Sequence, residues 1–92
     1  MLLSDADAVH ELASVPGWRR EGPEIIRTFS FPSYMAGIKF VGEAARVAEE
    51  VNHHPDIHIG WRKVTFRLST HSKGGLTGLD FALARTIDRI AL

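Results

Sequence analysis

The sequence predicts an α+β fold, a two-layer sandwich in which a four-stranded antiparallel sheet is covered on one face by helices. Apolar and polar residues alternate over residues 24–31 and 63–69, the pattern of strands with one buried face. Between these stretches, apolar residues recur every three or four positions over residues 34–51, the pattern of a helix. The expected order is helix, two strands, helix, two strands, helix, which favours antiparallel hairpins over a doubly wound parallel sheet.

The first element is expected to be a short helix over residues 3–14. Ser4 is suited to cap it, with Asp7 three residues later as the capping-box partner. Pro16–Gly17 then ends it. The apolar side of this helix is predicted to consist of Val9, Leu12 and Ala13.

A hairpin is expected next, with strands at residues 18–21 and 24–31 on either side of the turn at Gly22–Pro23. Ser33 follows Pro32 and is placed to cap a long helix. One apolar line on this helix is predicted to cover the sheet: Tyr34, Ile38, Val41, Ala45, Ala48 and Val51. A second line is either a subunit interface or the edge of a wide buried stripe: Phe40, Ala44 and Val47.

The second hairpin is expected over residues 56–70, with a tight reversal near residues 60–62. A glycine loop follows, in which Gly74 and Gly75 are expected to supply positive φ angles. Thr77 is placed to cap a last helix, with Asp80 as its capping-box partner. The apolar face of this helix is predicted to consist of Leu79, Leu83, Ile87 and Ile90.

Composition limits the function classes that this fold can serve. The chain has 92 residues, is 45% hydrophobic and carries eleven basic and eleven acidic side chains, which indicates one packed domain over residues 1–92. Neutral charge argues against direct nucleic-acid binding. Without a bilayer-spanning apolar run or a basic, apolar leader, we expect a cytoplasmic protein with no membrane partner. The absence of cysteine excludes disulfides and thiolate metal ligands, and the small core favours self-association.

The candidate site is a group of histidines. His53 and His54 follow a predicted helix end and precede Pro55, so both should leave from a loop at the rim of the sheet. His71 ends the last strand and is expected at the same rim. Glu49 lies four residues before His53, where its carboxylate is expected to hydrogen bond that imidazole.

Two kinds of chemistry suit these residues. Zinc is one alternative, since histidine is the commonest metal ligand, but adjacent histidines at a helix end splay apart and no H-E-x-x-H pair is present. We therefore favour a metal-free acid–base site without a cofactor. His58 is expected on the opposite strand face, and His10 is expected to be a solvated helix residue.

These residues carry a family resemblance. Glu49, the His53–Pro55 triplet, Trp61, His71 and Asp80 occur at spacings that resemble the signature of the pterin-4a-carbinolamine dehydratases. The likeness covers about residues 18–90, including F-S-F-P-S-Y, R-V-A-E-E-V-N-H-H-P and T-H-S-K-G-G-L-T-G-L-D. Ser72 departs from the pattern, because many members carry an acidic residue there.

The resemblance implies dehydration of 4a-hydroxytetrahydropterin to quinonoid dihydropterin, which recycles the cofactor of aromatic amino acid hydroxylases. It implies His53 and His71 as the acid–base pair, with His54 holding the hydroxyl or a ring nitrogen. Trp61 is expected to be a packing residue. The expected substrate contacts, some through backbone groups at the strand end, are Glu49, Asn52, Ser69, Thr70, Ser72 and Asp80.

Family members also imply a homodimer or homotetramer, in which sheets pair edge to edge and dimers join through helices. A second function class stays open, because one animal relative acts as a dimerisation cofactor of a transcription factor. A non-catalytic dimerisation or assembly partner of the same fold is therefore the alternative to an enzyme. The intact set of histidines and carboxylates favours the enzyme.

Overall fold

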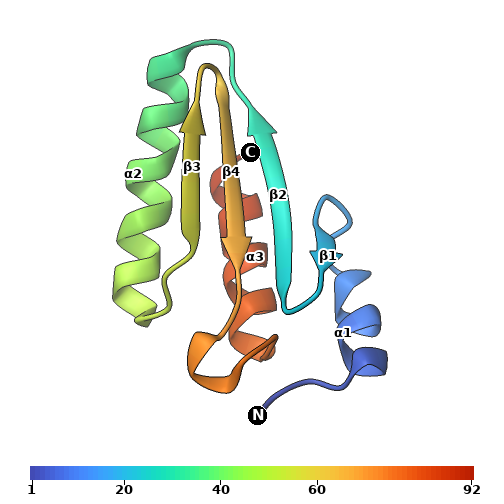
Figure 1. The fold of residues 1–92 in the computed structure, drawn as a ribbon. Coiled ribbons are helices and arrows are strands. Elements are labelled where there is room, and N and C mark those ends of the chain that lie inside the picture. The colour runs from blue at the N-terminus through green and yellow to red at the C-terminus, as the bar shows by residue number, and fades with distance from the viewer.

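The structure, a computed structural model that describes residues 1–92, has the predicted element order and confirms the α+β fold (Figure 1). The helices are α1 (Asp5–Leu12), α2 (Tyr34–Val51) and α3 (Gly78–Ile90), with a 3-10 turn, η1 (His71–Lys73). The strands are β1 (Arg19–Glu21), β2 (Glu24–Ser30), β3 (Asp56–Gly60) and β4 (Lys63–Leu68). All neighbouring strands are antiparallel, in the spatial order β1-β2-β4-β3. None of the helices combines the length and the apolar character needed to cross a bilayer.

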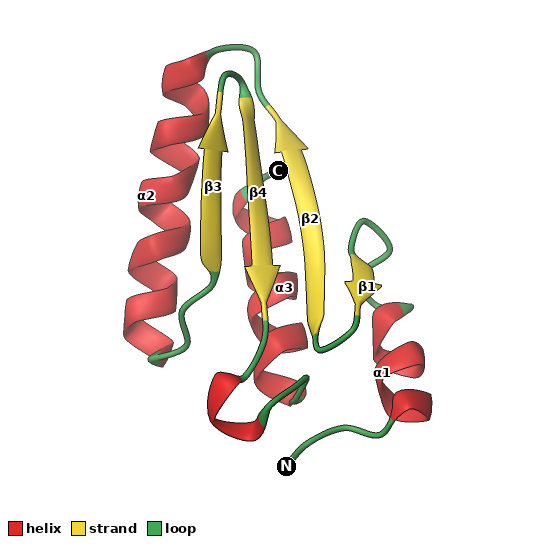
Figure 2. Ribbon diagram, viewed as in Figure 1, coloured by secondary structure: helices red, strands yellow, loops and turns green.

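The core lies between the sheet and the two long helices, α2 and α3 (Figure 2). Phe29 of β2, Phe66 of β4 and Phe40 of α2 form an aromatic cluster with ring centroids 5.0–5.8 Å apart. Tilted and edge-on contacts at this spacing add about 0.5–1.5 kcal/mol per pair beyond the burial of area. This cluster fixes α2 against the middle of the sheet, and so determines where the C-terminal end of α2 meets the sheet rim.

The face of α2 that covers the sheet is only partly the predicted one. Ala48 is buried as predicted, but Tyr34 and Val51 of the same line are about half exposed, at 48% and 55%. Phe40 and Ala44 of the second line are buried, so that line is part of the buried stripe, the second of the two alternatives. The physical reason is the aromatic cluster, because Phe40 turns the helix so that its own line faces the phenylalanines of β2 and β4.

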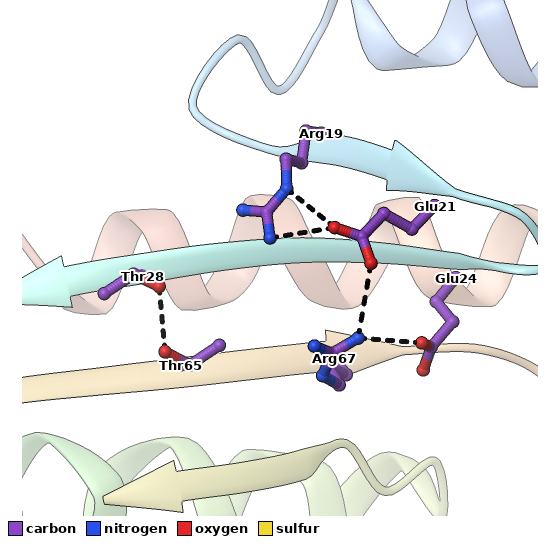
Figure 3. A network of polar contacts seen from close by, with 6 residues as sticks. All are labelled: Arg19, Glu21, Glu24, Thr28, Thr65 and Arg67. Carbon is purple, nitrogen blue, oxygen red and sulfur yellow. Dashed lines mark hydrogen bonds and ion pairs between the residues drawn. The ribbon is translucent and has the colours of Figure 1, made fainter. Parts of the chain in front are cut away.

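Charged side chains cover the other face of the sheet (Figure 3). Arg19 pairs with Glu21 at 3.0 Å, and Arg67 pairs with Glu24 at 3.0 Å. Ile26 shares a row with the two arginines and is fully buried, although it is not part of the core between sheet and helices. The aliphatic parts of these long side chains therefore exclude water from one apolar residue on an otherwise polar surface.

Three smaller expectations need correction. Ser4 caps α1 as predicted, but the helix buries Ala8, and Val9 is 64% exposed. Trp61 is 74% exposed in the β3–β4 turn, so it is not a packing residue of the core. Gly74 has the expected positive φ of 71°, but Gly75 does not; a Cβ there would lie 2.9 Å from a methyl of Leu2, which packs against that glycine.

Candidate active site

The segments that carry the predicted site residues meet at one end of the sheet. Figure 1 shows the C-terminal end of α2, the start of β3 and the loop after β4 together there, opposite the β3–β4 turn. The antiparallel register brings this about, because β4 ends beside the residues where β3 and β2 begin. The predicted common rim is therefore present.

A buried, hydrogen-bonded pair of side chains lies at the centre of this rim. His53 Nε2 is 2.6 Å from Asp80 Oδ1, and the two residues are 9% and 0% exposed. The other oxygen of Asp80 accepts the hydroxyl of Thr70 and the backbone N–H of Thr77, each at 2.9 Å. A carboxylate fully removed from water is stable only when it is hydrogen bonded in this way.

The direction of these hydrogen bonds assigns the proton of His53. An ionised carboxylate only accepts, so Nε2 of His53 donates to Asp80 and the neutral ring has its lone pair on Nδ1. Nδ1 has no hydrogen-bond partner in the protein, whereas every fully buried side-chain nitrogen or oxygen has one. Nδ1 is therefore on the part of the ring that solvent reaches. His53 also lines an apolar cavity of about 130 Å³ between α2 and α3.

Asn52 explains why the two adjacent histidines separate. It is in the left-handed conformation, with φ 53° and ψ 43°, which asparagine tolerates better than most residues. The N–H groups of Asn52 and His53 bond back to the carbonyls of Glu49 and Ala48, the Schellman arrangement that ends a helix. The turn directs His53 inward and leaves His54 exposed.

Glu49 does not contact the histidine that was predicted. Its carboxylate is 2.7 Å from Nε2 of His54, and both side chains are largely exposed. The expected contact with His53 is wrong, because the left-handed residue at the helix end interrupts the helical spacing on which it was based. Asp80 takes the place of Glu49 as the partner of His53.

His71 and Ser69 line a different cavity, of about 180 Å³, on the β2 side of the rim. Ser69 is 8% exposed, and its hydroxyl has no hydrogen-bond partner in the protein. Since every fully buried side-chain oxygen has a partner, this hydroxyl is not fully buried and opens into the cavity. The histidines thus share a rim without lining one cavity. His71 starts η1 and lines this cavity together with Pro23 and Glu24.

The backbone of Thr70 is not free to bind a ligand, contrary to expectation. Its N–H donates to the carbonyl of Gly75, and its own carbonyl accepts from Lys73 and Gly75. These bonds close the loop that carries His71 and Ser72. Ser72 is exposed and lines a third cavity, of about 370 Å³, together with Thr70 and Thr77.

Thr77 is the contributor that sequence reasoning described only as a helix cap. Its hydroxyl lies 2.8 Å from that of Thr70, and its N–H binds Asp80 in a complete capping box. The T-x-x-D pattern of Thr77 and Asp80, with another threonine seven residues before Thr77, was the signal that could have indicated this network.

The remaining histidines are where they were predicted. His10 is exposed on α1, and His58 is exposed on β3 opposite Thr65, on the face of the sheet away from the helices. No three His, Asp or Glu side chains gather into a group with the geometry of a metal site.

Comparisons with known proteins identify the family of the chain. The family model described as pterin 4 alpha carbinolamine dehydratase matches residues 1–90. Relatives that carry this activity as a provisional name include proteins of Roseiflexus castenholzii, 54% identical over 97% of this chain and 96% of that one, and Nocardia farcinica, 53% identical over 98% and 95%.

Two solved structures are similar. One, described as a transcriptional coactivator/pterin dehydratase from Brucella melitensis, has a TM-score of 0.96 at 31% identity and covers 100% of both chains. The other is a pterin dehydratase-like protein described as a RuBisCO assembly factor in the alpha-carboxysome; its TM-score is 0.67 at 25% identity, over 80% of this chain and 86% of that one. With a family model that spans nearly its whole length and relatives more than half identical to it, the chain belongs to the pterin 4 alpha carbinolamine dehydratase family.

Proposed function

We propose that the protein dehydrates 4a-hydroxytetrahydropterin to quinonoid dihydropterin and so recycles the cofactor of aromatic amino acid hydroxylases. The observation that carries the proposal is the buried His53–Asp80 pair, in which one ring nitrogen is held and the other opens to solvent. The family to which the chain belongs supports the pterin substrate. The reaction is also consistent with the cytoplasmic location expected from the sequence.

The chemistry requires two proton transfers. The bond between C4a and the hydroxyl oxygen breaks, and the oxygen takes up a proton and leaves as water. A ring nitrogen supplies the electron pair for the new C=N bond, and a ring N–H gives up a proton. One proton enters and one leaves the substrate, so two imidazoles that exchange protons near neutral pH are suited to the task.

His53 is the better prepared of the two imidazoles. Asp80 fixes the orientation of its ring and the position of its proton, so that Nδ1 accepts or returns a proton at the open edge without rearrangement. His71 is the second member of the pair. It is exposed and has no side-chain hydrogen bond, so its ring is free to rotate toward His53 when substrate binds.

The remaining residues are proposed to bind the pterin. His54, oriented by Glu49, holds the departing hydroxyl or a ring nitrogen. The unpaired hydroxyl of Ser69 faces the cavity beside His71 and suits the hydrogen-bonding edge of the ring. Asn52 and Ser72 are exposed at the same rim and remain proposed peripheral contacts.

A non-catalytic assembly role is the second candidate, because one structural neighbour is described as an assembly factor. The buried carboxylate favours the enzyme. Asp80 is 0% exposed, and burying a charge is costly unless its partners compensate for it. An interaction module that uses only its outer surface has no need of a carboxylate held against an imidazole in this way.

Self-association is proposed with either role. Strand β3 is at an edge of the sheet, where Ile59 is 41% exposed, and the following Trp61 is 74% exposed. Edge strands with apolar side chains and unpaired backbone groups favour pairing with a second copy. Light scattering after size-exclusion chromatography tests this; a strict monomer at micromolar concentration would contradict it.

The test of the function is direct. Purified protein is mixed with chemically generated 4a-hydroxytetrahydropterin, and the rise of quinonoid absorbance is compared with the spontaneous rate. The proposal predicts a rate proportional to protein concentration. A rate indistinguishable from the uncatalysed reaction would instead favour the assembly role.

A further inference from the structure

We propose that the hydroxyl of Thr70 is a positioning group for the reaction, which holds Asp80 so that the ring of His53 keeps the orientation in which it presents Nδ1. The inference rests on the proposed function, but it concerns residues that do not touch the reacting atoms. It replaces the substrate contact that the sequence suggested for Thr70.

The two threonines and the carboxylate form a chain with a single possible direction. Thr70 has one hydroxyl proton, and that proton goes to Asp80 Oδ2, which only accepts. In the 2.8 Å hydrogen bond between the two hydroxyls, Thr77 must therefore be the donor and Thr70 the acceptor. The hydroxyl oxygen of Thr77 accepts the N–H of Leu79 in turn. The hydrogen bonds run from Thr77 to Thr70 to Asp80, and each strengthens the next.

The Thr70 hydroxyl is not needed for the fold of this segment. The capping box of α3 requires only Thr77 and Asp80. The loop is closed by backbone bonds between Thr70 and Gly75, which do not involve the hydroxyl. What the hydroxyl adds is a second donor on Oδ2, which leaves Oδ1 alone to face His53.

Burial makes this second donor important. Thr70 and Thr77 are 7% and 3% exposed, so water does not readily replace a missing hydroxyl. Without it, Oδ2 keeps only the N–H of Thr77, and the carboxylate is held less firmly about its χ2 angle. Either oxygen still accepts the proton on Nε2 of His53, but the ring loses its fixed orientation.

The chain offers a matched control for the test. Thr28 and Thr65 form another hydroxyl–hydroxyl contact of 2.8 Å, on the open face of the sheet away from Asp80 (Figure 3). The replacement of Thr65 by valine also removes a hydroxyl from a contact between two threonines, in β4, the strand that precedes Thr70. The informative set is therefore Thr70→Val, Thr70→Ser, which keeps the hydroxyl, and Thr65→Val.

The first readout is the Nε2–H group of His53. Long-range ¹H–¹⁵N spectra of the histidine-labelled protein, at a pH where the ring is neutral, report which nitrogen carries the proton and how its hydrogen bond changes. We expect the Nε2–H form in the wild type and in all three variants, because either oxygen of Asp80 accepts this proton, and a shifted or broadened Nε2 signal in Thr70→Val alone. A wild-type ring protonated on Nδ1 would overturn the proposal without any variant.

The second readout is dehydration. Thr70→Val is expected to lower kcat by about tenfold, the effect of one buried hydrogen bond to a charged group, with little change in KM. Thr70→Ser should restore the rate, and Thr65→Val should leave it unchanged. A folded Thr70→Val protein with the wild-type Nε2 signal and rate would refute the positioning role. If the wild type has no dehydratase activity, the proposed function fails, whereas the Nε2 signal of Thr70→Val still decides the inference.

Discussion

Replacement of Asp80 by asparagine should leave the protein folded and largely inactive. Asp80 accepts three hydrogen bonds, two of them on Oδ2, from Thr70 and Thr77. An amide has one oxygen, which satisfies those two donors and turns its NH₂ group toward His53. Nε2 of His53 must then accept, so the ring proton moves to Nδ1 and the open nitrogen no longer has a lone pair.

The size of the effect follows from this exchange of roles. The misplaced proton removes a general acid–base contribution, so kcat/KM should fall by about 10²–10⁴-fold. Stability should change little, since weaker hydrogen bonds are offset by relief of the buried charge. We expect a net loss below about 2 kcal/mol and a melting temperature within roughly 10 °C of the wild type.

Asp88→Asn is the matched control. Asp88 lies on the same helix, and one of its oxygens accepts from Trp18 and Arg27. It is expected to lose stability to a similar extent and to keep its activity. Both variants are assayed for quinonoid formation and for thermal unfolding. The reasoning is refuted if folded Asp80→Asn retains activity within about twofold of the wild type, or loses no more than Asp88→Asn.

Three further predictions concern the fold and the rim. Gly42→Ala should raise the melting temperature by a few degrees, because no atom lies within 4 Å of the added Cβ and alanine favours a helix interior by about 1 kcal/mol; a lower value contradicts this. Gly17→Ala should lower the free energy of unfolding by about 1–3 kcal/mol, because its Cβ would lie 2.5 Å from the Arg27 guanidinium, which is held in an ion pair with Asp88. An unchanged midpoint in denaturant titrations would argue against close packing of Arg27 on Gly17. Glu49→Gln should change the free energy of unfolding by no more than about 1 kcal/mol, since its pair with His54 is exposed. It should slow dehydration by less than the ~10²-fold expected of an acid–base group. A larger loss of rate would show that Glu49 takes part in proton transfer.

The order of elements could be predicted because local signals agree with the fold. The first hairpin turns at Gly22–Pro23 as predicted, Gly74 has the expected positive φ, and Thr77 caps α3 as its spacing indicated. The buried face of α2 could not be predicted, because two apolar lines along it both satisfy helical spacing. Only the position of the phenylalanines on β2 and β4 distinguishes them, and that depends on tertiary packing.

The site could be predicted as a set of residues but not as a set of pairs. Helical spacing favoured Glu49 as the partner of His53, whereas the left-handed Asn52 directs His53 to Asp80, 27 residues away in the chain. Asparagine just before the histidine pair was the available sign that the helix ends in such a turn. The separate cavity of His71 depends on how η1 folds, and no pattern in the sequence reports it.

The central claim is that His53, held by Asp80, moves a proton during dehydration. A double-mutant cycle on the dehydration rate, with His53→Ala, Asp80→Asn and the two combined, tests it most directly. If Asp80 acts through His53, each single variant approaches the spontaneous rate and the double variant is no slower than His53→Ala. A His53→Ala protein that dehydrates the pterin at the wild-type rate would contradict the claim.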